Sequence, residues 1–182
     1  MEQIELEIIL TLLKNNELHV RGIAKSVKQP HANISRAMKK MLDSNIVDFR
    51  TMGKNKIFRL KKSVETLQYV YSAEHFKLLK LIERYPFLSV IVEEILSKTE
   101  GEKLVAIFGS FAKFNAKSDS DIDIFVETEK RAIKTELEKI NSRISVKIGV
   151  FDKNNILIKE ITKDHVIIKG VEHFYEKNRI FD

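Results

Sequence analysis

Residues 103–127 read KLVAIFGSFAKFNAKSDSDIDIFVE, and this stretch is the most informative about the fold of the second half of the chain. Its first seven residues form a short apolar run that ends in glycine, which is typical of a buried strand. Its last seven residues alternate, with Asp121, Asp123 and Phe125 on one face and isoleucine or valine on the other. Two strands separated by a polar loop predict a domain of the α/β (α+β) class.

The polar residues of this stretch predict a site for a phosphorylated ligand. Asp121 and Asp123 lie two apart on a strand, so their carboxylates point the same way and favour a divalent cation between them. Gly109 allows the backbone to approach a phosphate closely, and Ser110 begins a predicted helix whose N-terminus favours an anion. Metal-binding carboxylates beside a phosphate site are the parts needed for nucleotidyl transfer.

The glycine–serine pair, with S-D-x-D eleven residues after the glycine, resembles the signature of the DNA polymerase beta-like nucleotidyltransferases. The small prokaryotic members, the minimal nucleotidyltransferases, are the most similar. The resemblance covers about residues 86–182 and implies a mixed sheet with flanking helices. By position, it implies that Asp121 and Asp123 are catalytic and bind Mg²⁺, and that an NTP is bound by Gly109, Ser110 and Ser120.

Two departures from the family pattern bear on activity. A second glycine is common five residues after the first, and here that position is Phe114. The third carboxylate of the family belongs on the next strand, 144–150, where Ser145 or Lys147 stands instead. An inward-pointing Lys147 would weaken metal binding. Glu127 and Asp152 could replace the missing acid only if the backbone bent them inward.

Charge is distributed unevenly along the chain. Residues 1–62 contain 13 Lys and Arg against six Asp and Glu, whereas residues 63–182 contain 19 against 20. The whole positive excess therefore lies in the first third of the chain. Such asymmetry predicts a basic N-terminal module that binds a polyanion, joined to a near-neutral module with a different task.

The basic module has the pattern of three helices and a β-hairpin, with helices expected at 2–15, at 19–27 and after Pro30. The third helix would bury Ile34, Ala37, Met38, Met41 and Leu42, leaving a basic face outward. This pattern over residues 1–62 resembles a winged helix-turn-helix domain that binds double-stranded DNA. The predicted DNA contacts are Asn33, Ser35, Arg36, Lys39 and Lys40 on the helix, and Arg50, Lys54 and Lys56 on the hairpin. The alternative is a protein-interaction module whose lysines keep it soluble.

Residues 63–85 form a long helical pattern that is expected to connect the two domains. Val64, Leu67, Tyr71, Leu78, Leu81 and Tyr85 make a heptad seam, with Glu74 as its single polar member. The seam could hold a homodimer, which would suit two DNA half-sites, or it could pack against the chain's own domains. Further helices are expected at 87–98, 129–142, 155–163 and 171–178, and a further strand at 165–169.

These patterns together predict a transcription regulator whose second domain binds Mg²⁺–nucleotide with weak or no turnover. The alternative is an active nucleotidyltransferase that moves an NMP to a hydroxyl, and the resemblance implies a toxin-type protein as acceptor. The chain has no cysteine, its histidines lack metal-ligand spacing, and no apolar run is long enough to span a membrane. We therefore expect a cytoplasmic protein with no membrane partner.

Overall fold

The structure is a computed structural model that describes residues 2–179. These residues divide into two compact units between Ala73 and Glu74, within the long helix α4 (Val64–Arg84). Within the described residues, no helix is long and apolar enough to cross a membrane.

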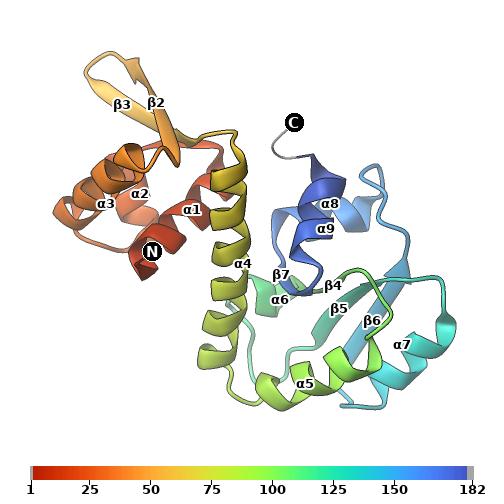
Figure 1. Ribbon diagram of the computed structural model, residues 1–182. Helices are drawn as coiled ribbons and strands as arrows, with labels where there is room; N and C mark the ends of the chain where they lie inside the picture. Colours follow the sequence, from red (N-terminus) through yellow and green to blue (C-terminus); the bar gives the residue numbers. More distant parts are fainter. Residues whose placement is uncertain (1, 180–182) are drawn as a thin grey trace. The chain divides into compact units, whose positions relative to one another are not determined.

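The N-terminal unit combines helices with a small antiparallel sheet. In chain order its elements are α1 (Gln3–Asn15), β1 (Glu17–His19), α2 (Val20–Val27), α3 (His31–Asp43), β2 (Val47–Met52), β3 (Asn55–Leu60) and α4 as far as Ala73. The strand order is β1-β3-β2. The β2–β3 hairpin turns at Gly53, whose φ of +60° favours glycine, and it projects beyond the helices of this unit (Figure 1).

Helix α3 follows the expected pattern closely. Pro30 precedes it as the N-cap residue, and the Pro30 carbonyl accepts hydrogen bonds from Asn33 N and Ile34 N. The predicted apolar face is buried at Ile34, Ala37, Met38 and Met41, while Leu42 is half-buried. The opposite face is exposed to solvent apart from the half-buried Ser35.

The C-terminal unit is built on a four-stranded mixed sheet. After the second half of α4, its elements are α5 (Leu88–Lys98), β4 (Val105–Phe108), α6 (Gly109–Ala112), β5 (Ile122–Glu127), α7 (Arg131–Glu138), β6 (Ile144–Gly149), α8 (Ile156–Lys163), β7 (Val166–Lys169) and α9 (Val171–Asn178). The strand order is β6-β5-β4-β7, and only the β5–β6 pair is parallel. Figure 1 shows α5 and α7 on one side of the sheet and α8 and α9 on the other.

Both faces of this sheet are covered. The side of α5 and α7 contains the larger apolar cluster, which includes Ile122, Ile124 and Val126 of β5. On the other side, Phe125 of β5 is buried, and Phe174 of α9 is fully buried with its ring 5.7 Å from that of Phe151. The alternation expected for residues 121–127 is therefore confirmed, and it separates Asp123 from the larger cluster.

Three details differ from the sequence-based expectations. The helix expected at 129–142 is shorter, since α7 runs only from Arg131 to Glu138. A turn follows it, in which the Asn141 side chain accepts a hydrogen bond from Arg143 N. The strand expected at 144–150 ends one residue earlier, at Gly149, and Val150 lies beyond it and is 58% exposed. Strand β1 was not expected, since a three-residue strand exists only through its pairing with the distant β3.

The heptad seam is largely internal in its second half. Glu74 and Leu81 are buried, and Leu78 and Tyr85 pack against the apolar cluster of the C-terminal unit. These side chains are therefore not available to a second copy of the helix.

Candidate functional site

Asp121 and Asp123 lie at the start of β5. Asp121 is exposed and directly precedes the strand, and Asp123 is the second residue of the strand. Asp123 is paired with Phe108 on the antiparallel neighbour β4 and with Ser145 on the parallel neighbour β6. Because residues in register share a face of the sheet, Ser145 is the β6 side chain next to Asp123.

Gly109 brings the end of β4 against Asp123. Its φ is +70°, and a Cβ atom at this position would overlap the Oδ2 atom of Asp123. Only glycine therefore permits this approach of backbone and carboxylate. Gly109 opens the single-turn helix α6, which places the half-buried Ser110 next in the chain. The structure thus brings together the glycine–serine pair and the second aspartate.

Charged groups from several elements affect Asp123. Burial raises the pKa of Asp123, and the carboxylates of Asp121 and Glu160 raise it further. Lys147 and Lys113 oppose this effect and lower the pKa. The carboxylate of Asp123 is therefore held where its negative charge is unfavourable without a compensating cation.

Glu160 and Lys113 were not predicted from the sequence as site residues. Glu160 lies on α8, and its carboxylate is 3.8 Å from the Lys113 ammonium, which follows α6. No motif or spacing marks either residue, because Glu160 comes 37 positions after Asp123. Only the fold places α8 near this end of the sheet.

No acid on β6 takes the place of the third carboxylate. Glu127 is four positions along β5 from Asp123, about 13 Å at strand spacing, and its Oε2 is 2.6 Å from His173 Nε2. Asp152 follows the end of β6 on that same far side and accepts a hydrogen bond from Asn154 N. Lys147 forms no ion pair with Asp121 or Asp123 in the described part of the chain.

The comparison with known families concerns the C-terminal unit. Residues 91–178 match the family model described as polymerase beta, nucleotidyltransferase. The C-terminal unit contains a nucleotidyltransferase-like domain. No curated protein and no solved structure matches the chain.

Within the nucleotidyltransferase-like domain, Asp121 and Asp123 are the two carboxylates that the sequence predicts as ligands of a divalent cation. Across residues 2–179 there is no group of three or more His, Cys, Asp or Glu residues that could hold a metal ion. Asp121 and Asp123 could therefore hold a cation only together with ligands from elsewhere. The phosphates of a bound nucleotide are such ligands, and Mg²⁺ is commonly held by one or two carboxylates plus phosphate oxygens.

Phe114 and Ser120 lie in the loop between α6 and β5. Phe114 has a φ of +56°, a left-handed conformation, and its side chain packs against the apolar cluster. The backbone thus keeps a conformation typical of glycine, while the ring is anchored in the core. Ser120 Oγ accepts a hydrogen bond of 2.8 Å from Lys117 N and so stabilises the loop turn.

In the N-terminal unit, the residues predicted to contact DNA differ in whether they already form ion pairs within the protein. Lys40 Nζ lies 2.8 Å from Glu5 and 3.1 Å from Glu2, which raises the pKa of Lys40. Arg50 donates two hydrogen bonds to Glu17. Both cations are thus already paired.

The remaining predicted contacts are more accessible. Asn33, Arg36 and Lys39 are exposed on α3, and neither Arg36 nor Lys39 forms an ion pair with another described residue. Lys54 and Lys56 are exposed at the hairpin turn, and the Lys56 ammonium lies 4.1 Å from the centre of the Phe49 ring. Ser35 is half-buried, with its Oγ 3.4 Å from His31 Nδ1.

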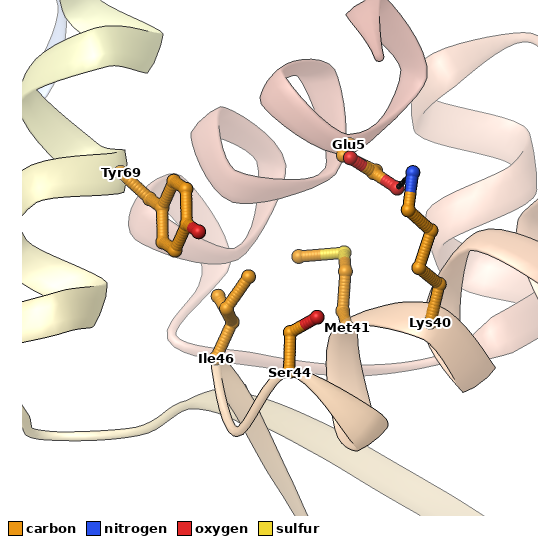
Figure 2. Close-up of a pocket in the computed structure, with 6 residues that line it drawn as sticks. All are labelled: Glu5, Lys40, Met41, Ser44, Ile46 and Tyr69. Atoms are coloured by element: carbon orange, nitrogen blue, oxygen red, sulfur yellow. Dashed lines mark ion pairs between the residues drawn. The ribbon is translucent and has the colours of Figure 1, made fainter. Parts of the chain in front are cut away.

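Figure 2 shows the Lys40–Glu5 pair beside a small pocket of the N-terminal unit. The pocket has a volume of about 110 Å³, and its other lining residues are Met41, Ser44, Ile46 and Tyr69. Pockets for small organic ligands usually start at about 300 Å³, so this one is too small for a nucleotide.

Proposed function

We propose that this protein is a DNA-binding regulator whose nucleotidyltransferase-like domain binds Mg²⁺–nucleotide with weak or no turnover. In this proposal, the N-terminal unit is a winged helix-turn-helix domain. Helix α3 enters the major groove of double-stranded DNA, and the β2–β3 hairpin is the wing.

The order of elements in the N-terminal unit supports this assignment. A helix, a short strand, two further helices and a hairpin occur in that order, and the three strands form one sheet. The exposed face of α3 carries Asn33, Arg36 and Lys39, which are side chains suited to base edges and phosphates. Lys54 and Lys56 add positive charge at the hairpin turn, where a wing would contact the backbone of DNA.

The approach of Gly109 to Asp123 supports the nucleotide site. Asp121 and Asp123 would hold Mg²⁺ together with the phosphates of an NTP, and the backbone at Gly109 and Ser110 would bind those phosphates. When bound, the ion would neutralise the developing charge on phosphate oxygens. The unfavourable charge of Asp123 without a cation is consistent with this role.

The pairing of Ser145 with Asp123 is the observation that carries the proposal of weak turnover. A serine hydroxyl at this position lacks the negative charge of a carboxylate, so it is a weaker ligand for a cation and does not accept a proton readily at neutral pH. A hydroxyl acceptor bound here would lack a general base on β6.

Calorimetric titration tests the nucleotide site. Mg²⁺–ATP and Mg²⁺–CTP are titrated into the wild-type protein and into the Asp121→Ala, Asp123→Ala double variant. We expect metal-dependent binding of at least one nucleotide to the wild type and none to the variant. Equal binding to both proteins, or no binding to a folded wild type, would rule out the proposed site.

The position of Glu160 favours a second candidate function, an active nucleotidyltransferase. Its carboxylate comes from α8 and is close enough to affect Asp123, so it could serve as the base that β6 lacks. The acceptor would be a hydroxyl, for example on a toxin-type protein partner. Transfer of labelled NMP by the wild type, lost in Glu160→Gln and kept in Glu172→Gln, would support this candidate. Glu172 is an exposed glutamate on α9 and serves as the matched control.

A further inference from the structure

Arg143 holds the loop that presents the first aspartate. This loop, residues 113–121, contains no helix or strand, and Asp121 is its last residue. Arg143 lies just before β6, and its side chain donates from Nη2 at 2.8 Å and from Nε at 3.1 Å to the carbonyl oxygen of Ser120. Two N–H groups of a guanidinium on one carbonyl restrain the backbone directly before Asp121.

The same side chain also contacts the segment that carries the glycine–serine pair. The Arg143 guanidinium lies 5.9 Å from the centre of the Phe111 ring and 5.2 Å from that of Phe87. Phe111 belongs to α6, is 1% exposed, and comes two residues after Gly109. A cation and the face of an aromatic ring attract each other at this separation, so the Arg143 side chain is held between the loop and α6.

The backbone of Arg143 adds a third restraint. Its carbonyl accepts a hydrogen bond of 2.7 Å from the amide of Ile122, the residue between the two aspartates. The chain on either side of Asp121 is therefore attached to Arg143, by the side chain at Ser120 and by the main chain at Ile122. Two carboxylates that repel each other need such restraint to stay on one cation, since loop residues otherwise relax apart.

We propose that Arg143 is a positioning residue that holds Asp121 beside Asp123 and Gly109 for metal–nucleotide binding. The inference rests on the proposed nucleotide site and adds to it a residue that touches neither metal nor nucleotide. Residues that orient metal ligands without touching the metal themselves contribute about 10-fold or more to metal affinity.

The test compares Arg143→Met and Arg143→Lys with the wild type. Methionine keeps much of the length of the side chain and removes all its donors, whereas lysine keeps the charge and a single ammonium. Arg131→Met is the matched control, because Arg131 is exposed at the start of α7. Binding of Mn²⁺–ATP is measured by calorimetry, and amide hydrogen exchange is measured at Lys117, Ser120 and Ile122.

We expect Arg143→Met to raise the Kd for Mn²⁺–ATP about 10-fold, Arg143→Lys to have a smaller effect, and Arg131→Met to have none. The amides of Lys117, Ser120 and Ile122 should exchange faster in Arg143→Met, while those of β4 stay protected. Unchanged affinity and unchanged exchange in Arg143→Met would overturn the inference.

Two other outcomes are also decisive. If Arg143→Met loses protection throughout the C-terminal unit, Arg143 supports the whole fold and the specific role is wrong. If the wild type itself binds no Mn²⁺–ATP, the proposed nucleotide site fails, and a positioning role for metal binding fails with it. Faster loop exchange in that case would show that Arg143 anchors the loop for stability alone.

Discussion

The carboxylate of Asp123 occupies the space that a side chain at residue 109 would need. A Cβ atom on Gly109 would overlap Asp123 Oδ2, and the φ of +70° at Gly109 is one that other residues rarely adopt. The end of β4 can therefore lie against the start of β5 because residue 109 has no side chain and the Asp123 carboxylate fills the space that one would need.

Replacing Gly109 with alanine should damage both stability and ligand binding. The left-handed backbone alone costs alanine about 1–2 kcal/mol, and the methyl group would displace the Asp123 carboxylate. We expect a lower free energy of unfolding in urea and loss of metal–nucleotide binding. Gly101→Ala is the control, because a Cβ atom at Gly101 has no neighbour within 4 Å. Equal behaviour of the two variants would contradict the account of Gly109.

Asp123→Asn should make the protein more stable without ligand while abolishing metal-dependent binding. Burial and the Asp121 carboxylate raise the pKa of Asp123 above its unfolded value, so stability is lost as the pH rises through the unfolded and then the folded pKa. The amide does not ionise. The gain should be small, about 1 kcal/mol or less because solvent screens the site, present at pH 7 and absent near pH 3. Urea unfolding at both pH values measures it, and a destabilised variant at pH 7 would contradict the prediction.

Glu74 should make the C-terminal unit sensitive to acid. Burial by itself would raise the pKa of Glu74, but Lys77, His165 and Tyr175 together lower it to about 2. Tyr175 donates a hydrogen bond of 2.8 Å to Glu74 Oε1, and the Lys77 ammonium is 3.7 Å from Oε2. A lowered pKa contributes stability above about pH 4.5 that is lost as the pH falls toward 2.

The variant Glu74→Gln tests this prediction. We expect a loss of about 3 kcal/mol at pH 7, as is usual when one partner of a buried ion pair is removed. The difference from the wild type should shrink between pH 4.5 and pH 2. Denaturant unfolding over that pH range measures it, and a difference that does not change with pH would contradict the assignment.

Lys39 and Lys40 are neighbours on α3 that should behave differently toward DNA. Lys39 is exposed, whereas Lys40 is paired with Glu2 and Glu5. Lys39→Ala should reduce the salt dependence of DNA binding by about 0.9 in the slope of log K against log salt, the value for one phosphate contact. Lys40→Ala should leave the slope nearly unchanged. Fluorescence anisotropy with duplex DNA at several salt concentrations measures both, and equal slopes for the two variants would contradict the distinction.

Ser145→Asp should strengthen the metal site. The new carboxylate would lie in register with Asp123 on β6, the strand on which the sequence resemblance implies a third acid. We expect tighter Mg²⁺–nucleotide binding, by about 10-fold, and a gain in nucleotidyl transfer or NTP hydrolysis. Ser142→Asp, in the exposed turn before β6, is the control for added charge. No change in binding in a folded Ser145→Asp protein would count against the role of this position.

Local patterns allowed the main elements to be predicted. The 3.6-residue periodicity of α3 and the alternation of β5 place Asn33, Arg36 and Asp123 correctly with respect to the core, because each pattern depends on neighbours a few positions away. The absence of an acid on β6 beside Asp123 was also predictable, since only Ser145 and Lys147 could face the site from that strand. The pairing in the sheet identifies Ser145 as the direct neighbour.

Contacts between distant segments were not predictable from the sequence. Lys40 and Glu2 are 38 positions apart, and Arg50 and Glu17 are 33 apart, so neither ion pair leaves a local signal. Strand β1 depends in the same way on β3. Glu74 appeared as an irregular member of a heptad seam, and its partners Tyr175 and His165 belong to the far end of the chain.

Titration of Mg²⁺–ATP into the wild-type protein, alongside Asp121→Ala, is the most direct test of the proposed nucleotide site. We expect saturable binding that requires Mg²⁺ and is lost in the folded variant. Binding that persists without Mg²⁺ or in Asp121→Ala, or no binding to the folded wild type, would contradict a nucleotide site at Asp121 and Asp123.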